Sequence, residues 1–283
     1  MKEYTQSADG RRLLWFVVLS YGISWSIWLL PVGPATEGLT LRAGGLSMAL
    51  PWKVLTLALG NFGPGIAAIV LTYYFEGWPG TSEMLRSFAP SRANLKWYLL
   101  AVLSPAAVAA LSLWIFDAAQ VGGEAIVHWV RVFLMNLLLA PLWEEIGWRG
   151  YLLRNLQLTR NSLLSTLLVA LVWGIWHIPL YWGGRFGFAV CFSIYIVALS
   201  VIFTWFYNKT CTNLAIVVLL HAAINASTIS LLGPTMSLLG LRPFLEITGL
   251  VSVIAIGILV TSGINLSCRN DLSRVGSTNI TPN

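Results

Sequence analysis

The sequence predicts an all-α protein, a polytopic bundle of about eight transmembrane helices. Of its 283 residues, 57% are hydrophobic and only 10% are charged, whereas soluble domains carry about a quarter charged residues. The mean hydropathy of +0.75 means that a soluble fold of this chain would expose more apolar surface than water tolerates. Segments of roughly 20 mainly apolar residues, the length of a spanning helix, recur along the whole chain.

The predicted spans cover residues 13–30, 52–75, 97–117, 125–148, 162–182, 188–207, 213–232 and 244–262. The first span follows Arg11 and Arg12, but no clear signal-peptide cleavage site follows it, so we expect it to be retained. The absence of a long polar stretch predicts a single integral membrane domain over residues 1–283, with a motif-bearing core at 95–232 and a polar C-terminal tail at 263–283.

The cations are distributed unevenly between the two sides of the predicted bundle. An even number of spans places both termini on one side, and that side holds eleven lysines and arginines against four on the other. By the positive-inside bias, both termini are expected to be cytoplasmic in a plasma or inner membrane. The net charge of +6 is thus explained by orientation and not by nucleic-acid binding. The three cysteines form no CxxC pair and predict neither a disulfide framework nor a thiolate metal site.

The fourth predicted span ends with adjacent glutamates. Glu144 and Glu145 point about 100° apart on a helix, so they cannot share one role. Glu145 and Arg149 are four residues apart in the favourable order for an ion pair. Glu144 then has no obvious local partner and is a candidate general base. The alternative is that all three form a structural charge cluster near the cytoplasmic boundary.

The fifth and seventh predicted spans also carry polar groups at helical spacing. Trp173 and His177 are i,i+4 neighbours, and Pro179 follows. His221 and Asn225 are i,i+4 neighbours too, so they share one helix face. Each group alone is equally well explained as a satisfied core histidine or an interhelical hydrogen bond. Because polar groups inside a bilayer are costly, their joint presence predicts one shared polar chamber.

At these residues the sequence resembles the CPBP intramembrane proteases, which include the type II CAAX prenyl endopeptidases and bacteriocin-processing or immunity proteins. The diglutamate-arginine motif is EEIGWR at 144–149, the aromatic-histidine motif is WGIWH at 173–177, and the histidine-asparagine motif is HAAIN at 221–225. Trp173 stands where the family usually has phenylalanine. Each motif is weak alone, but three in order on three spans are specific.

The resemblance implies hydrolysis of a peptide bond within the membrane. Glu144 and His177 would hold and activate a water, while His221 and Asn225 would stabilise the oxyanion formed from the scissile carbonyl. Glu145, Arg149 and Trp173 would support these groups from behind. We expect Glu144, His177, His221 and Asn225 to converge on one cavity that opens toward the cytoplasmic half of the bilayer.

The resemblance leaves metal dependence open. No HExxH motif occurs, so the usual two-histidine zinc helix is missing. Glu144, His177 and His221 could still supply three zinc ligands from separate helices. Asparagine is a poor zinc ligand, which favours the oxyanion role for Asn225. A mechanism without metal is the preferred expectation.

Two other functions fit the same sequence. A transporter would also place glutamate and histidine in a membrane cavity, although no inverted repeat is visible. A non-catalytic partner-binding protein, such as an immunity factor, would need no chemistry at Glu144 or His177. The expected partners are the lipid bilayer and a membrane-associated peptide or protein, and the sequence does not identify that substrate or say whether it is prenylated.

Overall fold

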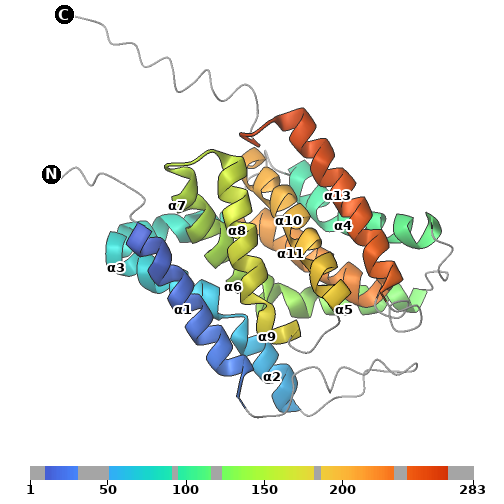
Figure 1. The fold of residues 1–283 in the computed structure, drawn as a ribbon, viewed down its shortest axis with the longest axis horizontal. Coiled ribbons are helices and arrows are strands. Elements are labelled where there is room, and N and C mark those ends of the chain that lie inside the picture. Colours follow the sequence, from blue (N-terminus) through green and yellow to red (C-terminus); the bar gives the residue numbers. More distant parts are fainter. Residues whose placement is uncertain are drawn as a thin grey trace, which may run out of the picture.

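The computed structural model is a bundle of helices, and it describes residues 10–30, 51–90, 95–115, 123–181, 186–232 and 241–266 (Figure 1). Within these ranges no strand occurs, which confirms the all-α class. The predicted C-terminal tail lies outside the described residues from position 267 onwards. In chain order the elements are α1 (Gly10–Trp28), α2 (Pro51–Gly60), α3 (Gly63–Arg86), α4 (Leu95–Ile115), α5 (Gly123–Leu139), α6 (Pro141–Glu145), the π-helix η2 (Ile146–Leu153), α7 (Arg154–Gln157), α8 (Ser162–Trp176), α9 (Ile178–Tyr181), α10 (Phe186–Lys209), α11 (Leu214–Ser227), the π-helix η3 (Thr228–Leu232) and α13 (Arg242–Ser262).

Five helices in the described part of the chain are long and apolar enough to cross a membrane, or six if a bent pair counts as one span. Eight spans were predicted, and a helix does lie at each predicted place. The difference arises mainly at the first and seventh. Polar residues dilute α1, which starts beside two arginines, and the apolar helix at Leu214–Ser230 is short.

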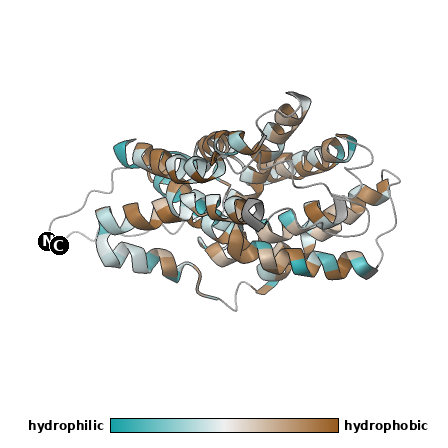
Figure 2. Cartoon of the chain, turned by 90° about the horizontal axis from the view of Figure 1, so that it is seen from below, coloured by the Kyte–Doolittle hydropathy of each residue, from teal (hydrophilic) through white to brown (hydrophobic). Residues whose placement is uncertain are grey.

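The outer faces of these helices are apolar. Large hydrophobic side chains are widely exposed on α4 and α13, for example Trp114 at 80% and Val260 at 79%. Figure 2 shows apolar colouring on outward-facing turns along the bundle. Water does not tolerate apolar surface on this scale, whereas lipid does. The chain is therefore an integral membrane protein.

The segment that carries the glutamates packs closely on α3. A Cβ added at Gly147 would lie 2.5 Å from Pro64 Cβ and 2.7 Å from Pro64 C, and one added at Gly65 would lie 2.8 Å from the Trp143 ring. Small residues at such positions let helix backbones approach in a membrane. The Gly63-Pro64-Gly65 sequence is thus explained by contact with α6 and η2.

We expect Gly147→Ala to lower the free energy of unfolding by about 1–3 kcal/mol, since overpacking forces the backbone or side chains to shift. Gly249→Ala is the matched control, because a Cβ there meets nothing within 4 Å. It is expected to leave stability unchanged or raise it by about 0.5–1 kcal/mol, the usual gain from alanine in a helix. Denaturant unfolding of both variants in the same detergent makes the comparison. Equal stabilities would contradict the close contact.

Candidate active site

The two glutamates lie just after a break in the fourth predicted span. The helices Glu124–Leu139 and Pro141–Gln157 are bent by 44° relative to each other, with Ala140 outside the helical region of φ and ψ. Proline at the first position of the second helix fits this break, because its missing N–H is not needed there. The predicted span at 125–148 is therefore two segments, and the second continues to Gln157.

Arg149 lies in the π-helix η2, whose residues are all buried. π-helical turns are rare and occur frequently at functional sites. The sequence offers no sign of this turn, since an α-helix satisfies the same apolar pattern.

Glu145 and Arg149 form the predicted ion pair, and both side chains are fully buried. Arg149 Nη1 donates to Glu145 Oε1 at 2.9 Å and to Oε2 at 3.0 Å. A third group joins them, because His221 Nδ1 lies 2.7 Å from Glu145 Oε1. A carboxylate only accepts hydrogen bonds, so this contact fixes the Nδ1 proton and directs Nε2 away from Glu145.

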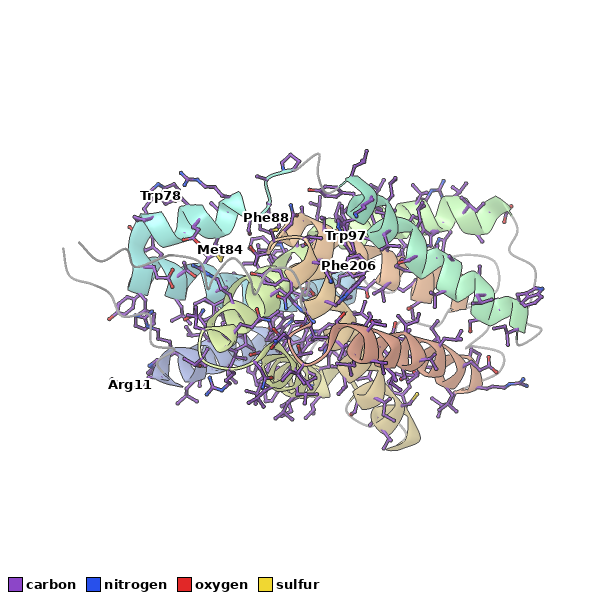
Figure 3. The ribbon with its side chains drawn as sticks, turned by 90° about the horizontal axis from the view of Figure 1, so that it is seen from above. Arg11, Trp78, Met84, Phe88, Trp97 and Phe206 are labelled. Atoms are coloured by element: carbon purple, nitrogen blue, oxygen red, sulfur yellow. The ribbon has the colours of Figure 1, made fainter. Side chains whose placement is uncertain are left out.

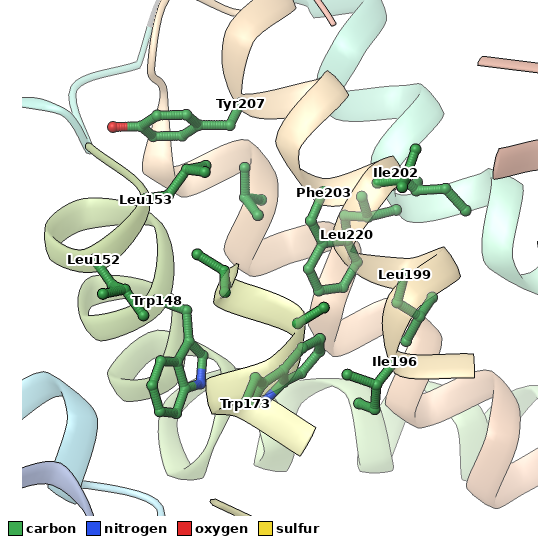
Figure 4. Packing of buried hydrophobic residues seen from close by; sticks show 14 of the residues in the cluster. Trp148, Leu152, Leu153, Trp173, Ile196, Leu199, Ile202, Phe203, Tyr207 and Leu220 are labelled. Carbon is green, nitrogen blue, oxygen red and sulfur yellow. The ribbon is translucent and has the colours of Figure 1, made fainter. Parts of the chain in front are cut away.

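Aromatic rings enclose the Arg149 guanidinium. Its Cζ lies 4.8 Å from the Trp173 ring centroid and 4.6 Å from that of Phe203. Figure 4 shows these two rings side by side, Trp173 from α8 and Phe203 from α10. Cation–π attraction is strongest where the cation is desolvated, as it is here. Phe203 could not be selected from the sequence, because it is one of many apolar residues in its helix.

Trp173 contacts Glu144 and both histidines. Its Nε1 donates to Glu144 Oε2 at 2.9 Å. Its ring centroid lies 5.7 Å from that of His177 and 5.5 Å from that of His221. A supporting role for Trp173 was expected from the family resemblance. Its contact with Glu144 comes from another helix and could not be seen in the spacing.

His177 follows the last residue of α8 and is held by its own helix. His177 Nδ1 lies 2.8 Å from the Trp173 carbonyl oxygen, which can only accept, so Nδ1 carries the proton. In the neutral ring Nε2 is then an acceptor that can receive a hydrogen bond from water. Rings of Trp176 and Phe192 lie 4.8 and 5.1 Å away, centroid to centroid.

One cavity of about 320 Å³ brings the four predicted residues together. Glu144, His177, His221 and Asn225 all line it, from α6, the end of α8, and α11. The rest of the wall is mainly apolar and comes from α8–α10, η3 and α13: Trp173, Leu180, Phe188, Phe192, Tyr195, Ile196, Leu199, Thr228, Ile229 and Phe244. A mainly apolar pocket with a few convergent polar groups has the character of a substrate site.

The donors in this cavity do not form a ready zinc site. Among the described residues, no three histidine, cysteine, aspartate or glutamate side chains are grouped so that they could hold one ion. The Nδ1 atoms of both histidines already have acceptors, and Glu144 accepts from an indole. Glu144, His177 and His221, the alternative zinc ligands, share a cavity without forming such a group.

Comparison with known proteins identifies the same region. Residues 126–227 match the family model for the type II CAAX prenyl endopeptidase Rce1-like proteins. The CAAX prenyl protease 2 of Methanococcus maripaludis is 28% identical over 102 residues. The match covers 32% of this chain and 38% of that relative. The matched segment contains all three motifs and, with them, Glu144, His177, His221 and Asn225 of the cavity.

Proposed function

We propose that the chain is a member of the CPBP family of intramembrane proteases, on the match of residues 126–227 to the type II CAAX prenyl endopeptidase family model, and that it is an endopeptidase that cleaves a membrane-associated peptide. The observation that carries this proposal is the convergence of a carboxylate, two oriented imidazoles and a carboxamide on one cavity. Each of these groups has a role in hydrolysis, and each is anchored by a hydrogen bond or by its helix.

In this mechanism Glu144 is the general base. It accepts a proton from a water that also donates a hydrogen bond to His177 Nε2, and the water oxygen attacks the scissile carbonyl carbon. A positioned base of this kind contributes about 10²–10⁴-fold in rate. The Trp173 indole fixes the carboxylate, so Glu144 needs no rearrangement before it acts.

The oxyanion of the tetrahedral intermediate is stabilised by Asn225 and His221. Because the Nδ1 proton of His221 faces Glu145, its Nε2 can donate only when the ring is protonated. The Asn225 amide donates in every protonation state. Asn225 is thus the permanent donor, and His221 is suited to pass a proton to the leaving amine. Every step uses groups of the chain itself, and we expect cleavage to persist in the presence of a zinc chelator.

We expect Asn225→Ala to lower kcat by about 10²–10³-fold with little change in KM, as loss of one oxyanion donor does elsewhere. Asn136→Ala is the matched control, because Asn136 donates to Val132 O within its own helix. The measurement is steady-state cleavage of a fluorogenic peptide in detergent or liposomes. A change confined to KM would assign Asn225 to substrate binding alone.

The first substrate to test is a prenylated CaaX-type peptide, since the archaeal relative is named a CAAX prenyl protease. A second, apolar cavity of about 250 Å³ adjoins the first, and Tyr195, Leu199 and Thr228 line both. Such a space suits an apolar group carried by the substrate close to its scissile bond. We place the protein in a plasma or inner membrane with both termini in the cytoplasm, on the distribution of lysine and arginine.

The proposed activity is tested by mass spectrometry of membrane peptides from cells that express wild type or Glu144→Ala. A peptide product found only with wild type is expected, and it would identify the substrate as well. Flux of a solute through proteoliposomes that depends on Glu144, with no peptide product, would favour a transporter. If the Glu144→Ala and His177→Ala variants protected cells as well as wild type does, a non-catalytic binding protein such as an immunity factor would be favoured.

A further inference from the structure

Helix α8 ends at Trp176, directly before the candidate catalytic residue His177. Here His177 N donates to Gly174 O at 3.2 Å and Leu180 N donates to His177 O at 2.9 Å, each three residues back and not four. Pro179, which follows His177 by two residues, has no N–H to donate. The last carbonyls of an α-helix have no partner within the helix and must be satisfied by other groups. The carbonyl of Trp176 is one of them.

Side chains of α1 donate hydrogen bonds to this end of α8. Trp25 Nε1 donates to Trp176 O at 2.9 Å. Tyr21 Oη, one turn earlier in α1, donates to Val172 O at 2.5 Å, one turn earlier in α8. Each contact joins residues that are 151 positions apart in the chain. Two long side chains of α1 therefore reach the last two turns of α8, on either side of Trp173.

A third side chain on the same face of α1 packs on the ring of Trp176. The Trp28 ring centroid lies 4.5 Å from that of Trp176, and the Trp176 ring lies 4.8 Å from that of His177. Aromatic pairs at these separations attract each other. Residues 21, 25 and 28 have the i, i+4, i+7 spacing of a single helix face. Helix α1 thus contacts both the backbone and the ring of the residue that precedes His177.

Helix α1 is itself fixed to the bundle along its length. Its start lies at the edge of the molecule, where Figure 3 labels Arg11, and Arg12 Cζ lies 4.4 Å from the centroid of the Phe75 ring in α3. Further along, Phe16 is fully buried and stacks on Tyr151 of η2, with 5.0 Å between the ring centroids. The other end of α1 lies beside α9 (Figure 1). A helix held in this way can serve as a support for the end of α8.

The α1 helix lies outside the part of the chain that matches the protease family. The match covers residues 126–227, whereas α1 covers Gly10–Trp28. The motif-bearing core predicted at 95–232 also begins after α1. The contacts between α1 and α8 are therefore a feature of this chain that the three motifs do not contain.

We propose that Trp25 and Tyr21 are positioning residues, which hold the end of α8 so that the His177 ring keeps its place in the cavity. The catalytic importance of that ring rests on the proposed function, whereas the contacts themselves do not. His177 Nδ1 lies 2.8 Å from Trp173 O, so the direction of Nε2 follows the backbone of the last turn. A shift of that turn moves the imidazole relative to Glu144, which belongs to α6.

The first test is the rate of peptide cleavage by Trp25→Phe, which loses the indole N–H and keeps an aromatic ring. We expect kcat to fall by about 10–10²-fold, the scale of a misplacement of about 1 Å in an active site, with KM close to that of wild type. Trp15→Phe is the matched control, because it makes the same change in the same helix at a side chain that is 54% exposed. Wild-type kcat in Trp25→Phe, or an equal loss in Trp15→Phe, would overturn the proposal. If Trp25→Phe does not fold, Tyr21→Phe, which loses only a hydroxyl, takes its place with the same control and the same outcomes.

The second test follows the His177 ring without any measurement of activity. The chain has three histidines, so isotope-labelled histidine gives few ring-nitrogen signals in an NMR spectrum, and a His177→Gln sample identifies those of His177. In wild type we expect the tautomer with the proton on Nδ1, which donates to Trp173 O. In Trp25→Phe we expect the His177 signals to move toward those of a mixture of both tautomers, while the His221 signals stay in place. Unchanged His177 signals, or equal shifts in both histidines, would overturn the proposal.

The two tests separate this proposal from the proposed function. His177 signals that move in Trp25→Phe, with no peptide product from wild type, would support the positioning contact and remove the endopeptidase. A Glu144-dependent product with equal kcat in wild type and Trp25→Phe would keep the endopeptidase and remove the positioning role.

Discussion

Replacing Glu144 by glutamine is expected to lower kcat for peptide cleavage by about 10²–10⁴-fold, the usual contribution of a positioned general base. The amide oxygen of glutamine can still accept from Trp173 Nε1, so the side chain keeps its place. It cannot accept the proton of the attacking water. The loss should therefore appear in kcat, while KM and the unfolding transition stay close to those of wild type.

The matched control is Glu83→Gln, at an exposed glutamate that contacts Arg154. It removes the same charge by the same chemical change, far from the cavity, and we expect wild-type kcat. Wild type, Glu144→Gln and Glu83→Gln are purified and reconstituted in liposomes in the same way, and kcat is measured for each. If Glu144→Gln kept more than about a tenth of wild-type kcat, a loss too small for a general base, Glu144 would not be the base.

The helices and the polar residues of the site could be predicted from the sequence. Both show in the spacing of apolar and polar residues along the chain. Polar groups in an apolar span must meet, since each is costly alone in a bilayer. The i,i+4 pair of Glu145 and Arg149 is a local relation along one helix. It could be predicted without knowing how any two helices pack, and the structure contains it.

The contacts between helices could not be predicted in the same way. Trp173 donating to Glu144, and His221 meeting Glu145, each join residues far apart in the chain. The bend at Ala140 and the π-helix η2 decide which way the glutamates point. The sequence pattern of the bend and of the π-helix is the same as that of a straight apolar helix.

Arg149→Met is expected to lower the free energy of unfolding by about 3–5 kcal/mol, because it leaves the fully buried Glu145 without its cation. The double variant Glu145→Gln, Arg149→Met removes both charges. It is expected to be more stable than Arg149→Met, since no uncompensated charge remains. The two single variants, the double variant and wild type form a double-mutant cycle, measured by denaturant unfolding in one detergent.

Arg160→Met is the control for loss of an arginine as such. Arg160 is exposed and contacts the neighbouring Thr159 side chain, so its replacement should change stability by no more than about 0.5 kcal/mol. A similar small effect at Arg149 would mean that the buried ion pair contributes nothing to the fold. Additive effects around the cycle would mean that the two charges act independently.

Arg149→Lys separates charge from shape at this position. In wild type Nη1 alone binds the carboxylate, while Nε and Nη2 have no hydrogen-bond acceptor among the described residues. Their planar group lies between the Trp173 and Phe203 rings instead. Lysine keeps the charge for Glu145 but has no plane to stack, and arginine and lysine are not interchangeable at stacked sites. Stability between those of wild type and Arg149→Met is therefore expected. Trp173 also donates a hydrogen bond to Glu144. Loss of the stacking contact should therefore shift Glu144, the proposed base, and lower kcat as well.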